Sequence, residues 1–555
     1  MSIDLSLDRL RILINHLPPY TRPTCHIAGT NGKGSVSAFV STILQSSSSS
    51  SSPSLKVGRY NSPHLTSIHD SITIDNIPVS PASYDAAHLE VTEKDEEKGT
   101  KLSSFEILTL IALRVFEMEQ VDVAVVEVGM GGRLDATNII PDEAILVSAL
   151  TAVDLDHQFF LGDTVGKIAF EKAGIARKGR SFVLGVQHPA HAEEVVSSVK
   201  KVVDEVGAVL VPALTVLERD WDTTVDGPNP GSFSLLTSSQ PFQSPAPQPI
   251  QISLPCFPSP LRTLLPLYGA HQLDNLGTAL TVINALLTDP LCEEKIKSQR
   301  NGSTWSTLKD IITPESVARG IKDTKWPGRL SFHTVHLPPT SRTPNEPPPP
   351  PFLVLADGAH NPASAKTLGA YITHLISKTF ESAKESLIHN KGSTSKPIHI
   401  NLNITYILSL SHSPPKTPLQ TLSPLFPLGI PLSITDDEIS VSTAISVVLP
   451  RFTPPEGMPW IKGVPPTEVK AVVEELNPDA EVWVVPDVDS PKVENGEEEE
   501  SALEKALRWA AGKRRESEDS ERRGGGGVVE QQANLVVLAG SLYLVADFYR
   551  GVFFF

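Results

Sequence analysis

Residues 26–35 have the composition of a phosphate-binding loop and read His-Ile-Ala-Gly-Thr-Asn-Gly-Lys-Gly-Ser. They stand just before an apolar helical pattern at residues 36–44. Glycines let backbone N–H groups approach phosphate oxygens, the helix N-terminus adds partial positive charge, and Lys33 adds a full one. The strict P-loop pattern is broken at Ala28 and at Gly34. The sequence therefore favours a loop that binds a polyphosphate. The alternative is an ordinary strand–helix turn without a ligand.

A second glycine-rich turn follows a buried strand pattern at residues 121–128 and reads Glu-Val-Gly-Met-Gly-Gly-Arg-Leu-Asp over residues 127–135. It places the carboxylate of Glu127 at the carboxyl end of a strand. Ligands of open α/β sheets bind at this edge, and Mg²⁺ prefers one or two carboxylates with phosphate oxygens and water. Glu127 is thus a candidate Mg²⁺ ligand; the alternative is a buried glutamate held by backbone donors.

Three more polar groups are weaker signals when taken singly. Asp156 and His157 follow the strand pattern at residues 144–149, Lys172 lies in a mostly apolar helix end, and Ser62 lies in a short polar turn. A lone histidine is more often structural than a ligand, and a lone lysine is more often a solvated charge. Only their position at the same sheet edge as Glu127 makes them candidates.

Composition excludes several classes of protein. The chain has 555 residues, 40% apolar residues and a net charge of −17, part of it in an acidic run near residues 493–504. Because nucleic-acid surfaces need basic patches, we expect no nucleic-acid partner, and the strand-length apolar runs predict no membrane span. Three widely spaced cysteines fit a reducing compartment. With an acidic N-terminus that lacks a signal core, they predict a cytoplasmic protein.

The order of patterns predicts an α/β fold in two domains. Apolar runs of four to eight residues alternate with helical patterns, which is typical of parallel sheets. We place the domains at residues 1–325 and 326–555. Three segments, near residues 46–54, 216–262 and 488–528, are rich in Ser, Pro or charge. They are predicted to be low-complexity insertions outside the core, and the first and the last are predicted to be disordered.

The motifs, taken in order, resemble the folate branch of the Mur ligase superfamily, which holds the folylpolyglutamate synthases and the dihydrofolate synthases. The resemblance is carried by residues 29–35, 62–64, 127–138, 156–157, 171–175, 326–329 and 357–361. Residues 451–460 and 540–544 look like the fungal dihydrofolate synthase members. The resemblance implies an N-terminal P-loop ATPase domain, like the central domain of Mur ligases, and a C-terminal Rossmann-like α/β domain.

An ATP-dependent amide ligase is the activity that the resemblance implies. Such enzymes phosphorylate a carboxylate with ATP, and the amine of L-glutamate then attacks the acyl phosphate. By the family's pattern, the ATP contacts are Thr30, Asn31, Gly32, Lys33, Gly34, Ser35, Asn275, Arg329 and Asp357. The implied Mg²⁺ ligands are Ser62, Glu127, His157 and, if carbamoylated, Lys172. Lys33, Lys172 and His157 are the implied catalytic residues, and Phe105, Glu106, Leu134, Asp135 and Ala136 match stretches that line the pterin pocket.

Four hypotheses follow from the sequence. The first is a dihydrofolate synthase acting on 7,8-dihydropteroate, favoured by residues 456–460 and by the short stretch before the phosphate loop. The second is a folylpolyglutamate synthase acting on a reduced folate. A catalytically dead scaffold would have no chemical reason to keep the metal and phosphate residues together, and a plain P-loop NTPase would leave residues 357–361 unexplained. We expect a monomer, as is common in the family.

Overall fold

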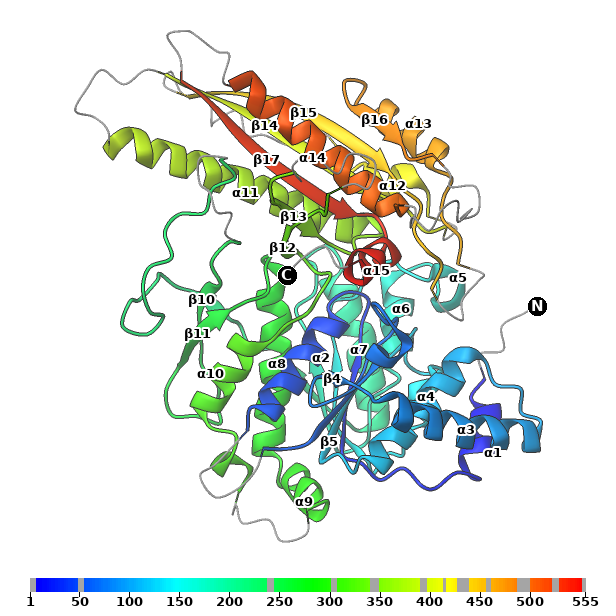
Figure 1. Cartoon of the computed structure of the whole chain (residues 1–555). Helices are drawn as coiled ribbons and strands as arrows, with labels where there is room; N and C mark the ends of the chain where they lie inside the picture. Colours follow the sequence, from blue (N-terminus) through cyan, green and yellow to red (C-terminus); the bar gives the residue numbers. More distant parts are fainter. Residues whose placement is uncertain are drawn as a thin grey trace. The chain divides into compact units, whose positions relative to one another are not determined.

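The computed structural model describes residues 6–47, 54–236, 244–300, 307–339, 349–389, 397–412, 416–426, 439–455, 461–486, 500–521 and 529–551 (Figure 1). The chain forms two compact units. Unit 1 comprises Met1–Asn229 and Pro247–Trp326, and unit 2 comprises Pro230–Ala246 and Pro327–Phe555. A segment from the first half of the chain, Pro230–Ala246, therefore belongs to the unit that is built mainly from the second half.

The main sheet of unit 1 has the strand order β4-β3-β2-β5-β1-β6-β7-β8. Strands β2, β5, β1, β6, β7 and β8 run parallel, and β3 and β4 continue the sheet antiparallel at one edge. The strands are β1 (Thr24–Ala28), β2 (Val57–Tyr60), β3 (Ile72–Ile74), β4 (Ile77–Pro78), β5 (Val123–Glu127), β6 (Ile145–Leu150), β7 (Ser181–Leu184) and β8 (Val209–Pro212). The predicted α/β class is confirmed.

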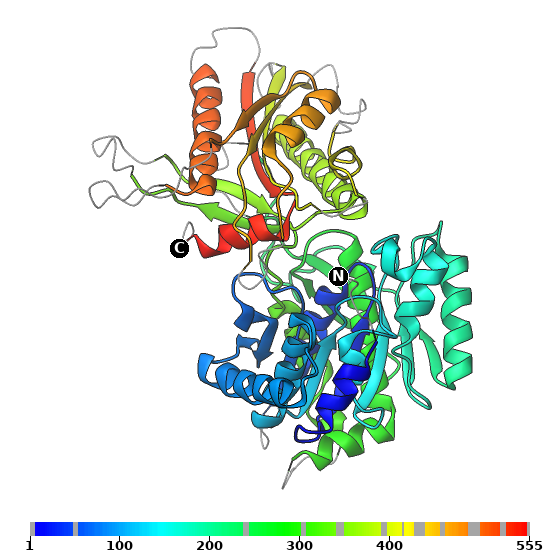
Figure 2. The same cartoon turned by 90° about the vertical axis from the view of Figure 1, so that its right-hand side faces the viewer.

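Helices cover the main sheet of unit 1 on both faces (Figure 2). Helix α2 shows why: Val36, Phe39, Val40 and Ile43 recur at helical spacing and are fully buried, so they form one apolar stripe. The helices are α1 (Asp8–Ile14), α2 (Lys33–Gln45), α3 (Pro81–Lys98), α4 (Ser104–Met118), α5 (Gln158–Leu161), α6 (Val165–Ala173), α7 (Ala192–Val206), α8 (His271–Thr288), α9 (Pro290–Ser298) and α10 (Pro314–Asp323). Short 3-10 turns are η1 (Ile68–Ser71), η2 (Ala136–Ile139) and η3 (Leu308–Asp310).

The segment near residues 216–262 is not the insertion outside the core that its composition predicts. It contributes β9 (Leu217–Glu218), β10 (Gln248–Ile252) and the start of β11 (Leu261–Leu265), which form an antiparallel sheet in the order β11-β10-β9. Ile250 and Ile252 lie two apart on one face of β10 and are buried in the core with α2 and α8. The high Pro, Ser and Gln content concealed this alternation, which is a strand signal.

The sheet of unit 2 has the order β12-β13-β17-β14-β15-β16, with β12 antiparallel to β13 and the others parallel. Its strands are β12 (Ser331–Val335), β13 (Phe352–Ala356), β14 (Ile398–Leu408), β15 (Ile439–Leu449), β16 (Glu481–Val484) and β17 (Val529–Ala539). The helices are α11 (Pro362–His389), α12 (Pro418–Leu422), α13 (Pro466–Leu476), α14 (Ala502–Glu521) and α15 (Leu542–Arg550). Strands that alternate with helices make this a second α/β unit.

The disorder predicted for residues 488–528 is wrong over residues 500–521, because α14 occupies most of that stretch. Leu503, Ala506, Leu507 and Ala510 are buried at helical spacing. Arg508 joins Glu504, four residues earlier, at 2.7 Å. The charged residues Glu504 and Arg508 thus pair with each other on an amphipathic helix. Residues 487–499 and 522–528 lie outside the described part of the chain, as do residues 48–53 of the serine-rich segment.

No helix within the described residues is both long enough and apolar enough to span a membrane. Cys25 and Cys292 are buried free thiols, and Cys256 is a half-buried one. Burial raises the pKa of the Cys25 thiol to about 12, so this group stays neutral. The cysteines therefore act as small apolar side chains in the core.

Candidate nucleotide and metal site in unit 1

Four parallel strands bring the predicted site residues of unit 1 to one edge of the sheet. Ile27 of β1 is in register with Glu127 of β5, and Ala28 of β1 is in register with Leu150 of β6. The phosphate loop follows β1, the Ser62 turn follows β2, Glu127 ends β5, and Asp156 with His157 comes after β6. Because these strands are parallel, all four carboxyl ends meet at the same edge.

The backbone of the phosphate loop is held open by two glycines. Gly29 has φ +148° and Gly32 has φ +92°, conformations that other residues rarely adopt. A Cβ atom on Gly32 would stand 2.2 Å from Oδ1 of Asn275. The amides of Thr30 and Asn31 donate to the carbonyl of Ala152 at 2.9 and 3.2 Å. Gly32 then begins α2 as its N-cap, so the loop leads directly into a helix N-terminus, as predicted.

Helix α8 supports the loop from a distant part of the sequence. Asn275 is buried and donates to Oε1 of Gln272 at 3.0 Å, and Gln272 in turn donates to Oγ of Ser35 at 3.3 Å. The structure therefore brings Asn275 to the phosphate loop, the neighbourhood that the resemblance implied. Gln272 is a supporting residue that the sequence did not single out, although it belongs to the same short stretch.

Trp326 lies against the other side of the loop. A Cβ atom on Gly34 would stand 2.4 Å from the Trp326 ring, so only glycine fits there. The guanidinium of Arg59 lies 5.2 Å from the centre of the same ring. Gly34 breaks the strict P-loop pattern, and the close approach of Trp326 is the physical reason for it.

Lys33 and Glu127 face each other at the sheet edge. The Lys33 Nζ atom lies 3.8 Å from Oε1 of Glu127 and donates to the Thr30 carbonyl at 3.3 Å. Oε2 of Glu127 accepts a 2.7 Å hydrogen bond from Nδ2 of Asn61, the residue before Ser62. Glu127 is 5% exposed, so its carboxylate is buried beside a cation and an amide. Asn61 is a partner that sequence reasoning missed.

Lys172 is the least expected group in the site, because it is 3% exposed near the end of α6. Its Nζ donates to the carbonyl of Gly29 at 2.8 Å. Burial, with a further contribution from the charge of Lys33, lowers the pKa of this amine to about 7. The close approach of Gly132 to the Lys172 carbonyl fixes the glycine turn after β5 against the same helix end.

His157 and Ser62 lie at this edge with more exposure. His157 has φ +50°, its side chain is 48% exposed, and its Nε2 is 3.8 Å from Oδ2 of Asp156. Ser62 is half-buried. Within the described residues, no three His, Cys, Asp or Glu side chains cluster closely enough to hold a metal ion. A cation at this edge would thus be bound by only a few protein donors, and oxygens of a bound ligand or of water would complete its coordination.

The residues predicted for the pterin pocket divide into two groups. The carboxylates are engaged within the fold: Glu106 completes the capping box of α4 with Ser103 and accepts from Arg9 at 3.0 Å, and Asp135 accepts from the amides of Met130 and Thr137. The apolar members differ in exposure. Leu134 is exposed, Ala136 is buried, and the Phe105 ring packs on Gly129 and stacks with Tyr60.

Arg329 and Asp357 belong to unit 2. The two carboxylate oxygens of Asp357 accept 2.8 Å hydrogen bonds from the amides of Leu330 and Ala359, and burial raises the pKa of Asp357. The guanidinium of Arg329 donates to the carbonyl of Gly328 at 3.0 Å. Asp357 therefore fixes the turn that carries Arg329.

A cavity of about 290 Å³ lies away from these residues, between α14 and the sheet of unit 2. Its polar lining includes Asn403, Thr405, Ser446, Lys513, Arg514 and Asn534. None of the predicted site residues lines this cavity. The predicted site residues of unit 1 that follow β1, β2, β5 and β6 lie instead at the carboxyl edge of the main sheet.

Comparison with known proteins identifies the family. The chain is 30% identical to dihydrofolate synthetase of Saccharomyces cerevisiae over 473 residues, which cover 85% of this chain and 86% of the relative. It is 26% identical to the probable dihydrofolate synthetase of Schizosaccharomyces pombe over 99% of both chains. Residues 441–551 match the family model for the C-terminal domain of dihydrofolate synthetase. The chain belongs to the dihydrofolate synthetase and folylpolyglutamate synthase family, a family of ATP-dependent ligases.

Solved structures share the fold. Folylpolyglutamate synthase of Mycobacterium tuberculosis, complexed with ADP and AMPPCP, matches with a TM-score of 0.62 at 23% identity over 98% of this chain and 95% of that one. FolC of Escherichia coli in complex with ADP matches with a TM-score of 0.59 at 22% identity over 99% and 94%. The chain thus shares its α/β fold with these proteins.

Proposed function

We propose that the chain joins L-glutamate to 7,8-dihydropteroate with cleavage of ATP, giving 7,8-dihydrofolate, ADP and phosphate. The two fungal relatives that match most of this chain bear the name dihydrofolate synthetase. The observation that carries the proposal is the group formed by Lys33, Glu127 and Lys172 around the glycine loop after β1. Residues 456–460, which favoured this substrate in the sequence, lie outside the described part of the chain.

ATP binding is assigned to the phosphate loop. The amides from Gly32 to Ser35 begin α2 and present donors and partial positive charge to phosphate oxygens. Thr30 and Asn31 shape the loop, and Asn275 closes it from α8. In the phosphoryl-transfer transition state, charge spreads over the transferring oxygens, and Lys33 would leave Glu127 to neutralise it. Arg329 and Asp357 are proposed as further ATP contacts.

The donor set fits Mg²⁺. Glu127 offers a buried carboxylate, Ser62 a hydroxyl, and His157 an imidazole at the same sheet edge, and Mg²⁺ favours few protein ligands combined with phosphate oxygens and water. When bound, Mg²⁺ would supply positive charge that offsets the negative charge of the phosphates. Asn61 holds Glu127 in position through the 2.7 Å hydrogen bond to Oε2, leaving Oε1 facing the loop.

Lys172 is proposed to carry a carbamate. A neutral amine adds CO₂: the nitrogen lone pair forms an N–C bond and one proton leaves, which gives a carbamate anion. A lysine with an ordinary pKa is protonated at neutral pH and unreactive, whereas burial brings the pKa of Lys172 to about 7. The product is a carboxylate-like oxygen ligand at a position where the chain has an amine.

The ligase reaction then has two proposed steps. A carboxylate oxygen of dihydropteroate attacks the γ-phosphorus of ATP, the bond to the β-phosphate oxygen breaks, and ADP leaves. The neutral α-amine of L-glutamate attacks the acyl carbon, and the tetrahedral intermediate loses phosphate and a proton. Phe105, Leu134 and Ala136 are proposed as apolar contacts of the pterin, whereas Glu106 and Asp135 are proposed to shape that pocket through the backbone they hold.

Phosphate release from ATP with L-glutamate and Mg²⁺ tests the proposal. We expect release with 7,8-dihydropteroate and none with tetrahydrofolate. Release with tetrahydrofolate alone would contradict the proposal and favour a folylpolyglutamate synthase, the name borne by other relatives of this chain. Release with both would show a bifunctional enzyme, and release with neither would favour the scaffold hypothesis.

A further inference from the structure

The cavity of about 290 Å³ in unit 2 is lined by described residues of that unit alone. Helix α14 lies across β17, β14 and β15, and the cavity lies between this helix and the middle of the strands (Figure 1). Protein interiors are close-packed, and voids larger than a water molecule are few in a domain. This one is close to the lower bound of about 300 Å³ for small-molecule pockets. Its lining therefore decides which kind of molecule it could hold.

The floor of the cavity is a polar patch on the sheet. Asn403 and Thr405 lie two residues apart on β14, so they share one face of the strand. Asn534 of β17 is in register with Asn403, and Ser446 of β15 is in register with Thr405. In parallel α/β units, the sheet face that a helix covers is normally apolar. These polar side chains on adjacent strands thus depart from the pattern that packing against α14 alone would favour.

Asn534 is the member of this patch whose side chain most needs a partner. It is 8% exposed, and neither the nitrogen nor the oxygen of its side-chain amide makes a hydrogen bond within the described part of the chain. The neighbouring Asn403 differs, because its amide nitrogen donates to Oε1 of Gln532 at 3.1 Å. A buried polar group without a hydrogen bond is costly, and buried polar groups in native proteins are almost always paired. A bound molecule with a donor and an acceptor close together would satisfy both atoms of Asn534.

Two cationic side chains of α14 line the cavity opposite the sheet. Ala510, Lys513 and Arg514 are three and four residues apart, so they lie on one face of the helix. The Nζ atom of Lys513 lies 2.9 Å from Oε1 of Glu481. Arg514, which is 7% exposed, donates to the carbonyl of Pro351 at 2.6 Å. Ammonium and guanidinium groups only donate hydrogen bonds, so a ligand that reaches them must accept, and negatively charged oxygens are the strongest acceptors.

The donors and acceptors of the lining narrow the class of ligand further. An ionised carboxylate or phosphate could accept from the amide nitrogen of Asn534, but it has no hydrogen to donate to the amide oxygen. An ammonium group could donate to that oxygen, but the positive charges of Lys513 and Arg514 would repel it. A hydroxyl group donates without carrying charge. The cavity therefore fits a small anion that carries a hydroxyl group near its charged oxygens.

We propose that this cavity is a second small-molecule site, whose ligand is a small hydroxylated organic anion, either a hydroxy carboxylate or a hydroxyalkyl phosphate. Its charged oxygens accept from Lys513 and Arg514, and its hydroxyl group donates to Oδ1 of Asn534. The ligand thereby joins α14 to β17, so its binding stabilises the folded form of unit 2. The proposal is independent of the proposed ligase reaction, because none of the residues assigned to that reaction lines the cavity.

Isothermal titration calorimetry of the full chain tests the site with two probes. L-malate represents the hydroxy carboxylates, sn-glycerol 3-phosphate represents the hydroxyalkyl phosphates, and glycerol is the uncharged control. We expect at least one of the two anions to bind with a Kd below about 1 mM, and glycerol not to bind. The anion that binds more tightly identifies the charged group that the site selects. Failure of both anions to bind would overturn the proposal.

Two variants decide whether the anion binds beneath α14 or at the phosphate loop of unit 1. Asn534→Leu replaces the unpartnered amide by an apolar group of similar shape. It should weaken anion binding about tenfold or more and leave the midpoint of thermal unfolding unchanged or higher. Lys33→Met should bind the anion as the wild type does. Loss of binding in Lys33→Met but not in Asn534→Leu, or a lowered unfolding midpoint in Asn534→Leu, would overturn the proposal.

Lys513→Gln gives an independent test at a position where the fold is less at risk, because the Lys513 side chain is 23% exposed. The variant should weaken anion binding about tenfold, since a charged donor is lost. Lys470→Gln is the matched control: Lys470 lies on α13, is 40% exposed and pairs with Glu474, much as Lys513 pairs with Glu481. This control should bind the anion as the wild type does. Equal weakening in both variants would mean that the anion responds only to the net charge of the protein, which would contradict the proposed site.

Discussion

The Nζ atom of Lys172 donates a 2.8 Å hydrogen bond to the carbonyl oxygen of Gly29, the first residue of the phosphate loop. The two residues are 143 positions apart in the sequence, and the contact is buried. Lys172 therefore lies against the loop at which the proposed nucleotide and metal ion would bind. Burial makes the charged form of this amine costly and lowers its pKa to about 7, so its presence here favours a chemical role in addition to the hydrogen bond.

Replacing Lys172 by Ala should abolish ligase activity, because the variant cannot form the proposed carbamate. Short carboxylates such as acetate or propionate should restore part of the activity by occupying the vacated space. Depleting dissolved CO₂ should lower the activity of the wild type, and bicarbonate should restore it. The measurement is phosphate release at pH 7.5, with each acid added at rising concentration.

Lys167→Ala is the matched control for Lys172→Ala. Lys167 lies on the same helix, is 63% exposed and pairs only with the exposed Asp163. This variant should keep wild-type activity at every CO₂ level. Full activity in Lys172→Ala would remove the carbamate from the mechanism.

Replacing Lys33 by Met should reduce kcat by a factor on the order of 10²–10³ or more, because one cation opposite the transferring phosphoryl group is lost. The fold should persist, since Lys33 makes only a long contact with Glu127 and one hydrogen bond to its own loop. Circular dichroism and thermal unfolding check the fold, and ATP titration separates binding from turnover. Near-normal kcat would show that the loop has been assigned the wrong role.

His26 should make the protein sensitive to acid. It is fully buried in β1 and shares a 2.8 Å hydrogen bond with Thr137, and burial, with the charge of Arg177, lowers the pKa of His26 to about 3. The unfolded chain binds a proton near pH 6.5 and the folded chain does not, so the free energy of unfolding falls as the pH drops below 6.5. The contribution is about 2 kcal/mol between pH 7.5 and pH 5.

Urea unfolding of the wild type and of His26→Leu at several pH values measures this contribution. The difference in free energy of unfolding between the two proteins should change by about one proton's worth, about 1.4 kcal/mol per pH unit, below pH 6.5. It should be flat above pH 7. A difference that does not depend on pH would mean that the pKa of His26 is the same in the folded and the unfolded chain, which would contradict the prediction.

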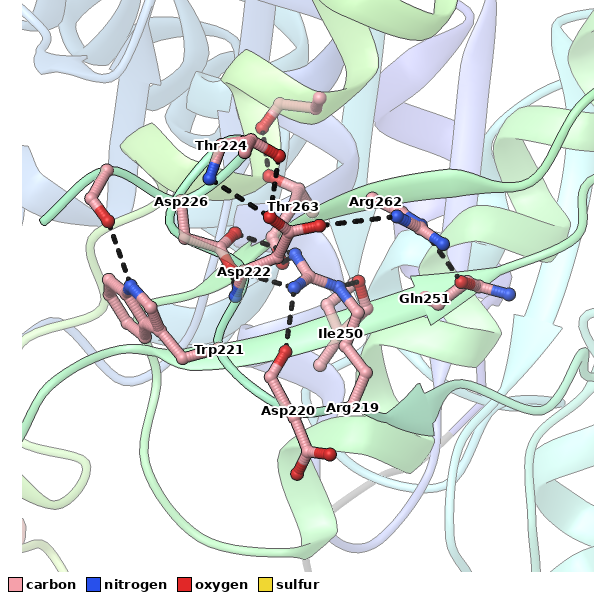
Figure 3. Close-up of polar contacts among 12 residues, drawn as sticks. Arg219, Asp220, Trp221, Asp222, Thr224, Asp226, Ile250, Gln251, Arg262 and Thr263 are labelled. Carbon is pink, nitrogen blue, oxygen red and sulfur yellow. Dashed lines mark hydrogen bonds and ion pairs between the residues drawn. The ribbon is translucent and has the colours of Figure 1, made fainter. Parts of the chain in front are cut away.

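Asp226→Asn should destabilise unit 1 by about 3 kcal/mol, because it removes the carboxylate charge beside the guanidinium of Arg219 and replaces one acceptor oxygen by an NH₂ group (Figure 3). Arg262→Gln is the control: its pair with Asp222 is long, at 3.6 Å, and half exposed, so it should cost less than about 0.5 kcal/mol. Denaturant unfolding monitored by hydrogen exchange at β10 measures both. Equal effects would show that the Arg219 pair contributes no more than a surface contact.

Local patterns in the sequence predicted the α/β class, the phosphate loop and Glu127 as a candidate ligand, whereas Ser62, His157 and Lys172 became candidate ligands through the family resemblance. Glycines at positions 29 and 32 need positive φ, and Lys33 follows them at the start of an apolar helix, so neighbouring residues suffice to predict this loop. Glu127 was placed at a strand end by the apolar run before it. These signals are short in range, because hydrogen bonding and side-chain periodicity within a few residues produce them.

Only the tertiary structure decided which distant groups act together. The burial of Lys172 under Gly29, the approach of Trp326 to Gly34 and the position of Asn275 beside Gly32 all join segments more than a hundred residues apart. The folding of residues 219–236 and of α14 was hidden by Pro-, Ser- and charge-rich composition. Composition averages over a segment, whereas burial depends on the few residues that meet a partner surface. Those partners lie in other parts of the chain, so the sequence determined the chemistry available and the tertiary structure determined where it is used.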